Sequence, residues 1–540
     1  MLLYRFLVGR RFFSSELCRK IDLHTMGFEA MDFVVRHSSK MSCQPIATPK
    51  SDCLSYEKAI NALNNLLPNS EFLKNSVVIQ QRGKESLNLV DTEKYLVRAG
   101  MTIEDLKKLK VIHISGTKGK GSTCALVESI LRHHGLRTGF YSSPHLVSAT
   151  ERIRLGGLPI SKESFAKYFW TIYRRLEANA THEGDFPPYF KFLTIMSFYV
   201  FLNENIDVAI YEVGIGGQYD CTNILPSTKT VGITSLGLEH TQILGNTLEE
   251  IAWQKAGIIK NGSDVFTVQQ QENVCVDVIR ERAEERDSKL FLVPEWKDYV
   301  WSRKPNVDSL NEIKVQQLNA SLAIQLALNW MHKNVDGSQE PYKIVTNLNE
   351  NVIRGLERCF WPGRCQLLQY ENKNFYLDGA HTYESIQVCS NWFSNSTKSN
   401  KNKKILIFNM TGPRQTSEMM TLLMKAIKFD VVFFVPNVAS VTNTTPDIIT
   451  SDDQLERCRD NEKIWNQIIL QNNNSTNVVT KVLPSIFDVM KFIDTNLCSK
   501  KIELAEQELD ILVTGSLHLI GACLMGLEEY DKRFRSNTQI

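Results

Sequence analysis

A glycine-rich segment at residues 115–123, SGTKGKGST, carries the residue types that bind the phosphates of a nucleotide. Glycines let the backbone wrap so that its N–H groups face phosphate oxygens, and a helix that follows adds the positive potential of its N-terminus. We expect Lys120 to reach the β- and γ-phosphates, and the hydroxyl of Ser122 or Thr123 to face Mg²⁺. The expected nucleotide-binding residues are Gly116, Thr117, Lys118, Gly119, Lys120, Gly121, Ser122 and Thr123.

The spacing of this segment departs from the strict phosphate-loop pattern G-x-x-x-x-G-K-[ST]. Ile114 occupies the position of the first glycine, and Gly121 separates Lys120 from Ser122. A glycine-rich turn between a strand and a helix, with no ligand, is the alternative interpretation. The sequence context favours the nucleotide site, because a β-rich run precedes the segment and apolar residues recur at helical spacing after it.

Two side chains further along the chain are candidates for holding a metal ion beside such phosphates. Glu212 ends the apolar run 208–211, and the carboxyl end of a buried parallel strand is where α/β proteins bind ligands. A glutamate exposed on an edge strand is the alternative, which the apolar lead-in disfavours. His240 follows the predicted strand 229–235. Imidazole is an uncommon ligand of Mg²⁺, so its position by itself favours a structural loop histidine.

The segments that must position these residues alternate between short β-rich runs and helical stretches from about residue 110 onward. The strand candidates of this first series are 110–115, 207–213, 229–235 and 264–268. Each is followed by a loop and a plausible helix, which predicts an α/β fold with a mostly parallel sheet covered by helices on both faces. A second series of strand candidates comprises 373–381, 403–412, 430–437 and 510–516.

The length of 540 residues is too great for one ordinary hydrophobic core, so two domains are expected. Pro362-Gly363 interrupts regular structure between the two strand series, and we place the domain boundary near residue 358. We therefore expect an N-terminal P-loop ATPase domain over 46–358. A smaller, Rossmann-like α/β domain is expected over 359–540.

Composition narrows the classes of function. The hydrophobic share of 43% and the charged share of 23% are ordinary for a soluble globular protein, and a net charge of +2 gives no reason to expect nucleic acid as a partner. No stretch approaches the ~20 apolar residues of a transmembrane helix. The 12 cysteines include no CxxC pair and no zinc-finger spacing, which indicates free thiols in a reducing compartment.

The first fifteen residues, MLLYRFLVGRRFFSS, are hydrophobic, bear arginines and serines, and include no acidic residue. This composition is typical of a mitochondrial transit peptide, so we expect residues 1–45 to be a targeting leader without fixed structure. A secretory signal and a disordered tail are the alternatives. Met26, Met31 or Met41 would start a shorter product. We therefore expect a mitochondrial form, in the matrix or at the inner membrane, and a cytoplasmic form.

Seven motifs taken together resemble the folylpolyglutamate synthase family, the folate branch of the Mur ligase superfamily. They are SGTKGKGST (115–123), YSSPHL (141–146), YEVGIGGQYDCTN (211–223), LGLEHTQILGNTLEEIAWQKAGIIK (236–260), FWPGR (360–364), LDGAHT (377–382) and LVTGSLHLIG (512–521). The resemblance covers roughly residues 55–525. The leader and PPYFKFLT (187–194) make it closer to eukaryotic forms. One departure is TGPRQ (411–415), where family members often carry acidic residues.

The resemblance implies a set of metal-binding residues in the first domain, where the folate site is also expected. Ser143 resembles a serine that contacts one Mg²⁺ ion, with the hydroxyl of Ser122 beside it. Glu212 resembles the acidic residue between two Mg²⁺ sites, and His240 resembles the histidine on the second ion. Lys255 matches a lysine that Mur-type ligases carbamylate. A carbamate is a carboxylate surrogate, so it can hold Mg²⁺ where a free ammonium group would repel it.

The resemblance also assigns the second domain to the reaction. Arg364 and Asp378 resemble residues that reach ATP from that domain, and His381 is a candidate for the base that deprotonates the incoming amine. The implied reaction is ATP-dependent addition of L-glutamate to the γ-carboxylate of tetrahydrofolate and its polyglutamates through an acyl phosphate. The implied cofactors are ATP, one or two Mg²⁺ ions and a monovalent cation, and a monomer is expected.

Folate and glutamate are both anionic, so Arg152, Arg154 and Lys191 are candidate carboxylate contacts. The aromatic cluster 189–192 would stack on a pterin, although core packing is the simpler interpretation. Three alternatives to the folate-extending enzyme stay open. They are a dihydrofolate synthase or bifunctional enzyme, a non-catalytic ATP-binding regulator, and a P-loop kinase.

Overall fold

In the computed structural model, the described strands form two large sheets of eight and six strands. The structure describes residues 55–67, 87–307, 310, 312–410, 416–440, 454–471, 478–498 and 508–536. The predicted leader at 1–45 and the segment 411–415 lie outside the described residues. In the part of the chain that is described, no helix combines the length and the apolar character needed to cross a membrane.

The first of two large sheets has eight strands in the order β4-β3-β2-β5-β1-β6-β7-β8. Its strands are β1 (Val111–Ser115), β2 (Thr138–Tyr141), β3 (Ile153–Leu155), β4 (Leu158–Pro159), β5 (Val208–Glu212), β6 (Thr230–Ile233), β7 (Asp264–Val268) and β8 (Lys289–Val293). The six strands from β2 to β8 in this order are parallel, whereas β3 and β4 pair antiparallel at the edge. Gly156-Gly157 forms the turn between β3 and β4, and both residues have the positive φ that tight hairpin turns require.

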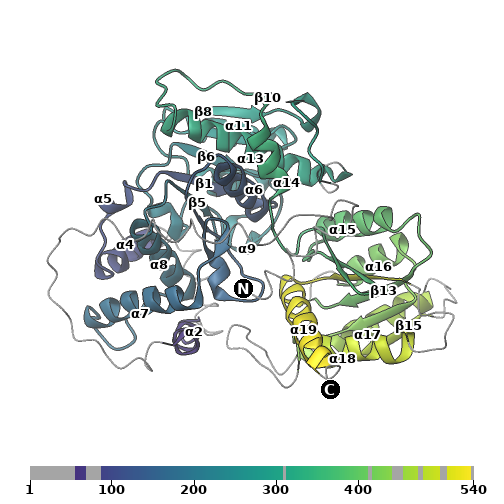
Figure 1. The fold of residues 1–540 in the computed structure, drawn as a ribbon. Coiled ribbons are helices and arrows are strands. Elements are labelled where there is room, and N and C mark those ends of the chain that lie inside the picture. Colours follow the sequence, from purple (N-terminus) through teal and green to yellow (C-terminus); the bar gives the residue numbers. More distant parts are fainter. Residues whose placement is uncertain are drawn as a thin grey trace, which may run out of the picture. The chain divides into compact units, whose positions relative to one another are not determined.

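Side chains of the central strands alternate between the two faces of this sheet. On one face, Val111 and Tyr211 pack with helices α2, α4, α7 and α8. On the other face, Ile112 and Ile210 pack with α6, α13 and α14. Because helices cover both faces (Figure 1), these strands read as continuous apolar runs in the sequence.

The helices around the first sheet begin and end as follows. They are α2 (Tyr56–Asn64), α4 (Leu87–Arg98), α5 (Ile103–Leu106), α6 (Lys120–His133), α7 (Lys162–Ala178), α8 (Tyr189–Asn203), α9 (Thr241–Leu244), α10 (Leu248–Ala256), α11 (Asn273–Glu284), α13 (Lys314–Asn334) and α14 (Glu350–Glu357). Short helices η3 (Ala149–Arg152), η4 (Cys221–Ile224) and η5 (Trp296–Asp298) lie in the loops, and β9 (Val300–Trp301) pairs with β10 (Asn347–Leu348).

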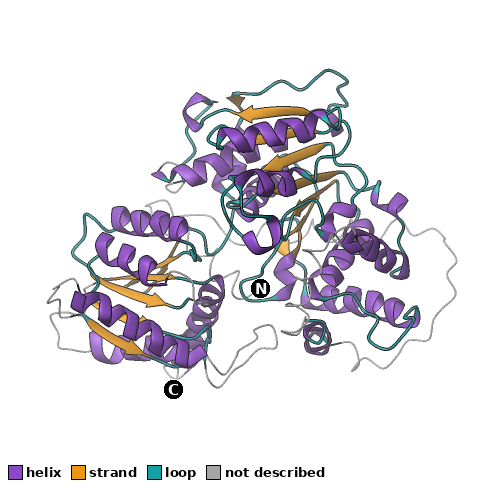
Figure 2. Cartoon of the chain, turned by 180° about the vertical axis from the view of Figure 1, so that it is seen from behind, coloured by secondary structure: helices purple, strands orange, loops and turns teal. Residues whose placement is uncertain are grey.

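The second sheet has six strands in the order β11-β12-β16-β13-β14-β15. Its strands are β11 (Gln366–Tyr370), β12 (Lys373–Leu377), β13 (Lys403–Phe408), β14 (Val431–Phe434), β15 (Val479–Val482) and β16 (Leu509–Thr514), and its helices are α15 (Tyr383–Ser396), α16 (Thr416–Ala426), α17 (Gln454–Gln471), α18 (Ile486–Phe492), η6 (Ile493–Cys498) and α19 (Leu517–Ser536). All its strand pairs are parallel except β11 with β12. Figure 2 shows these strands between layers of helices.

The predicted α/β class and the two series of mostly parallel strands are confirmed by these two sheets. The candidates at 207–213, 229–235 and 264–268 are β5, β6 and β7, and those of the second series are β12, β13, β14 and β16. The strand candidates left out β2, β3, β4, β8, β11 and β15 of the two large sheets. Residues of β8 and β15 are mostly exposed or half-buried, so the continuous apolar run of a central strand is absent there. The predicted boundary near residue 358 falls between α14 and β11 and stays a prediction.

Candidate functional site

A cavity of about 1650 Å³ is lined by loops from both sheets. The loops that follow β1, β2, β5 and β6 meet there, because the carboxyl ends of parallel strands lie at one edge of a sheet. The loop after β12, the linker 361–365 and residues of α4, α8 and α13 also line the cavity. The residues predicted from sequence that line it are Thr117, Lys118, Gly119, Lys120, Gly121, Ser122, Ser143, Glu212, His240, Arg364, Asp378 and His381.

The glycine-rich segment turns from β1 into α6, as predicted. Gly119 precedes the first residue of α6 and has a φ of 88°. A Cβ atom at this position would lie 2.1 Å from Asn319 Oδ1, so only glycine fits. Because glycine has no side chain to cap the helix, the first backbone N–H groups of α6 stay available for an anion at the edge of the cavity.

Gly116, Thr123 and Lys255 lie behind the lining rather than in it. The Thr123 side chain is fully buried. The carbonyl oxygen of Gly116 accepts hydrogen bonds from Lys120 Nζ at 3.1 Å and from Lys255 Nζ at 2.7 Å. Burial, and after it the nearby ammonium of Lys120, lowers the pKa of Lys255 to about 7. A large fraction of this amine is therefore neutral at neutral pH.

Glu212 is the last residue of β5 and lies beside the phosphate loop. It is 5% exposed, and its carboxylate accepts a hydrogen bond from the Ser143 N–H at 3.1 Å. Burial raises the pKa of Glu212 to about 7, although Lys120, the Ser143 N–H and Arg364 act in the opposite direction. Arg364 comes from the linker that leads into the second sheet. A side chain outside the first sheet therefore contributes to lowering the pKa of Glu212 against the effect of burial.

His240 and Glu239 form the rim of the cavity after β6. His240 has a φ of 52° and directly precedes α9. Burial lowers its pKa, so the imidazole stays neutral with lone-pair capacity for a cation. Glu239 accepts a hydrogen bond from Lys118 Nζ at 2.8 Å, which joins this rim to the phosphate loop.

The loop after β12 contributes the carboxylate of Asp378 and the imidazole of His381 to the same cavity, and the linker before β11 contributes the guanidinium of Arg364. Asp378 follows β12 and accepts hydrogen bonds from the N–H of Cys365 at 2.8 Å and from its thiol at 3.3 Å. His381 donates from Nδ1 to the carbonyl oxygen of Gly379 at 2.8 Å, which leaves Nε2 as the acceptor. Burial lowers the pKa of His381, so the neutral imidazole is favoured.

The residues beside Glu212 suit a hard cation that is held partly by phosphate and water. Among the described residues, no three His, Cys, Asp or Glu side chains gather closely enough to form a protein-only metal cage. A carboxylate and a serine hydroxyl, Glu212 and Ser122, do line the cavity next to the phosphate loop. That composition fits Mg²⁺, which retains waters and binds one or two carboxylates together with substrate phosphates.

The candidate carboxylate contacts Arg152, Arg154 and Lys191 all line the cavity. The Arg154 guanidinium lies over the Trp361 ring, with its Cζ atom 5.1 Å from the ring centroid. Phe192, in contrast, is fully buried against Phe169, with their ring centroids 4.9 Å apart. Core packing is therefore the correct interpretation of Phe192, and of the three aromatic residues at 189–192 only Phe190 lines the cavity.

Sequence reasoning missed Asp220, which fixes the shape of the loop after β5. Its carboxylate accepts hydrogen bonds from the N–H groups of Gly214 and Ile215 and from the N–H and hydroxyl of Thr222. His113 of β1 hydrogen-bonds the same hydroxyl through Nε2 at 2.8 Å. An Asx cap before a short helix was the available signal, since Asp220 directly precedes η4.

The chain was compared with protein-family models, curated proteins and solved structures. No family model matches it. It is 41% identical to "Folylpolyglutamate synthase, mitochondrial" of Homo sapiens over 455 residues, which are 79% of this chain and 76% of that protein. It is 37% identical to "Folylpolyglutamate synthase" of Saccharomyces cerevisiae (strain FostersO) over 503 residues, which are 88% of each protein.

Among solved structures, the fold is similar to that of the "FPGS-AMPPCP complex". The TM-score is 0.62 at 21% identity, over 88% of this chain and all of that one. The "FPGS-AMPPCP-folate complex" is similar with a TM-score of 0.60 at 20% identity, over 88% of this chain and 99% of the other. At this level of identity, the likeness concerns the arrangement of the two sheets and their helices.

Acid should destabilise the loop that His113 supports. Burial lowers the pKa of His113 to about 3, so the unfolded chain binds a proton near pH 6.5 while the folded chain does not. Stability is therefore lost as pH falls below 6.5. Between pH 7.5 and 5.5, we expect the wild type to lose about 1.4 kcal/mol more unfolding free energy than His113→Gln. Urea unfolding at both pH values measures this difference, and equal losses would contradict it.

Proposed function

The chain belongs to the folylpolyglutamate synthase family, and on that premise we propose that it joins L-glutamate to the γ-carboxylate of a folate with conversion of ATP to ADP and phosphate. The observation that carries the proposal is the 41% and 37% identity to two folylpolyglutamate synthases over most of their lengths. The cavity supports it, because it joins a phosphate loop, carboxylates and cationic side chains in one space.

The chemistry explains why such a cavity is needed. A carboxylate does not condense with an amine in water unaided, so the γ-phosphoryl group of ATP is first transferred to a folate carboxylate oxygen, with release of ADP. The neutral amine of glutamate then attacks the acyl carbon, and phosphate leaves as the amide forms. Lys120 and the N–H groups at the start of α6 offset negative charge on the phosphoryl group during transfer.

Mg²⁺ supplies charge neutralisation on the phosphate oxygens when it is bound. Ser122 and Ser143 are the residues we assign to a first ion, and Glu212 is assigned a place between that ion and a second one. His240 and a carbamylated Lys255 are assigned to a second ion. The lowered pKa of Lys255 supports this assignment, because only the neutral amine reacts with CO₂. A monovalent cation is included in the proposal by family resemblance alone.

The second sheet takes part through Arg364, Asp378 and His381. Arg364 and Asp378 contact ATP in this proposal, and the free Nε2 of His381 accepts the proton of the glutamate amine. We place the ATP-binding domain with the folate site at 46–358 and the C-terminal domain at 359–540. The hinge lies near Pro362-Gly363, so closure would exclude water from the acyl phosphate.

The acceptor is tetrahydrofolate or its polyglutamates, and the enzyme works as a monomer in this proposal. The nearest competing function is dihydrofolate synthesis, alone or in a bifunctional enzyme, with dihydropteroate as acceptor. A non-catalytic regulator is less compatible with the cavity, since Lys120, Glu212 and His240 all line it.

The first test is incubation of the purified protein with ATP, Mg²⁺ and labelled L-glutamate, with either tetrahydrofolate or dihydropteroate as acceptor. Mass spectrometry should find glutamyl residues added one at a time to tetrahydrofolate, with equal release of ADP. Lys120→Ala should lower the rate by 100-fold or more, because charge stabilisation in such a site is worth ~3 kcal/mol. ADP release without a gain of mass would contradict the function.

Lys255→Ala should lose most of the activity, and a small added carboxylate such as formate should restore part of it. The reason is that a carbamate supplies negative charge and oxygen ligands, which an ammonium group cannot. Labelled CO₂ should give a carbamate NMR signal in the wild type that the variant lacks. Identical spectra of the two proteins, under conditions where the wild type is active, would exclude carbamylation.

The mitochondrial and cytoplasmic forms depend on the N-terminal segment in this proposal. The human relative carries the description mitochondrial, and the arginine-bearing, acid-poor start of this chain supports the same destination. Deleting residues 1–40 should retain ligase activity and move the protein to the cytosol. Imaging of tagged full-length and shortened chains measures this, and an unchanged mitochondrial signal would place the targeting information elsewhere.

A further inference from the structure

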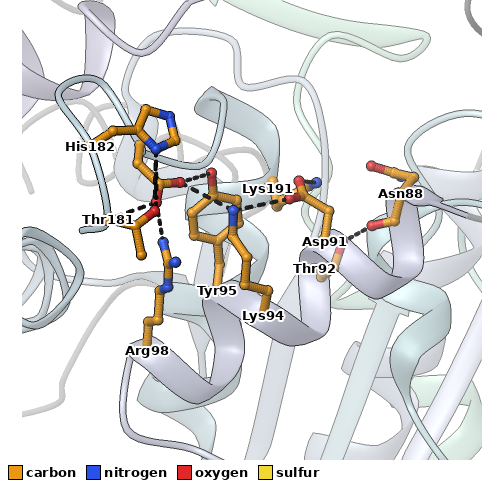
Figure 3. Close-up of polar contacts among 10 residues, drawn as sticks. Asn88, Asp91, Thr92, Lys94, Tyr95, Arg98, Thr181, His182 and Lys191 are labelled. Carbon is orange, nitrogen blue, oxygen red and sulfur yellow. Dashed lines mark hydrogen bonds and ion pairs between the residues drawn. The ribbon is translucent and has the colours of Figure 1, made fainter. Parts of the chain in front are cut away.

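One wall of the cavity is formed by helices α4 and α8 and by the residue that precedes α8. This α4–α8 wall includes Asn88, Asp91, Lys94, Pro188, Phe190 and Lys191. Figure 3 shows its polar side chains, with Asp91 between the two lysines. Among the lining residues that the two helices contribute, Lys94 and Lys191 are the only cations.

A single carboxylate, that of Asp91, contacts both lysines. Lys191 Nζ donates a hydrogen bond to Asp91 Oδ2, and Lys94 Nζ lies 3.5 Å from Asp91 Oδ1. The Lys191 side chain is only 6% exposed, whereas that of Asp91 is 41% exposed. The lysine is therefore fixed within the wall, and the carboxylate is the member of the pair that water and other solutes reach.

A second carboxylate, that of Asp185, accepts hydrogen bonds from three side chains of α4 and so holds this helix in place. Its side chain is 2% exposed, and it accepts hydrogen bonds from Tyr95 at 2.9 Å, Lys94 at 3.1 Å and Thr181 at 2.7 Å. Arg98 donates to it as well. Asp185 is therefore fully engaged and buried, so Asp91 is the partner that a ligand could replace.

Positive charge exceeds negative charge around the ring of Tyr95. Lys94, Arg98 and Lys191 lie 4.2, 5.7 and 5.8 Å from its centroid. Asp91 and Asp185 are the two carboxylates that pair with these three cations in the described contacts. The carboxylate of Asp220 accepts four hydrogen bonds from its own loop, so we do not count it as a counter-ion of Lys94 or Lys191.

The proposed reaction brings carboxylates to this wall. The reacting γ-carboxylate must lie at the phosphate loop, so the rest of the acceptor extends away from it along the cavity. Each round adds one glutamyl residue at the reacting end. Residues that were added earlier therefore move away from the phosphate loop, and each retains a free α-carboxylate. Long acceptors place carboxylates where short acceptors place their heterocycle.

We propose that Lys94 and Lys191 form a carboxylate subsite for the γ-linked glutamyl chain of long acceptors, with Asp91 as the counter-ion that the chain displaces. This inference rests on the proposed function and adds to it a residue-level basis for chain-length preference. An ammonium group has three N–H donors, and in a partly buried wall these bind a carboxylate with charge-assisted hydrogen bonds. Asp91 opposes that binding, because it occupies the same donors.

Two variants should change chain-length preference in opposite directions. Lys94→Met and Lys191→Met together should raise KM for tetrahydropteroyl pentaglutamate on the order of tenfold more than KM for the monoglutamate. Asp91→Asn should lower KM for the pentaglutamate relative to the monoglutamate, because it removes the competing carboxylate. Steady-state kinetics with the full-length protein measures both ratios, and NaCl should weaken the wild type's preference for the pentaglutamate.

Lys167→Met is the matched control, because Lys167 is an exposed lysine of α7 that does not line the cavity. It should leave the ratio of the two KM values unchanged. If the lysine variants change KM equally for both acceptors and lower the urea midpoint, the subsite is overturned. The two lysines then only hold α4 against α8. Failure of the wild type to extend either acceptor would instead overturn the proposed function itself.

Discussion

The carbonyl oxygen of Gly116 accepts hydrogen bonds from two ammonium groups, and the rest of the site is arranged around them. Burial, and after it the positive charge of Lys120, lowers the pKa of Lys255 to about 7, because one neutral carbonyl does not offset two ammonium groups. Glu212 and Glu239 lie close by. Burial acts to raise the pKa of both carboxyl groups, and the positive charge of Lys120 acts to lower it. Charges of both signs are therefore gathered beside the glycine-rich segment.

Buried carboxylates in this protein divide into two kinds by their hydrogen bonds. Asp185 and Asp220 are surrounded by donors from their own neighbourhood, so they hold loops and helices in place. Glu212 receives one backbone hydrogen bond in the described contacts, and burial raises its pKa. A carboxylate that is buried but sparsely satisfied is costly for stability, and such groups are found where a ligand supplies the missing partners.

The linker between the two sheets touches the phosphate loop directly, which couples the two halves of the cavity. The Trp361 ring packs against Phe140, with their centroids 5.5 Å apart, and carries the Arg154 guanidinium on its face. A Cβ atom on Gly121 would lie 3.0 Å from this ring. Arg364 follows three residues later, and its positive charge opposes the burial that raises the pKa of Glu212. The linker therefore takes part both in the packing at Gly121 and in the charge around Glu212.

The sequence by itself determined the α/β class, most of the parallel strands and the glycine-rich turn at 115–123, because each depends on local pattern. Buried parallel strands read as apolar runs, and the turn from β1 into α6 needs glycine at Gly119 for backbone reasons. The ordered motifs also brought Glu212, His240 and Asp378 to attention before their positions were known, and all three line the cavity.

Only the tertiary structure decided which side chains share a space. The pairing of Lys191 with Asp91 joins residues 100 positions apart. His113 and Asp220 are linked through the hydroxyl of Thr222, which both of them hydrogen-bond, and this link depends on the register of β1 with β5. Phe190 and Phe192 stand two residues apart, yet one lines the cavity and the other is fully buried. Periodicity predicts that a face is apolar, but burial and charge depend on what packs against that face, and distant parts of the chain supply it.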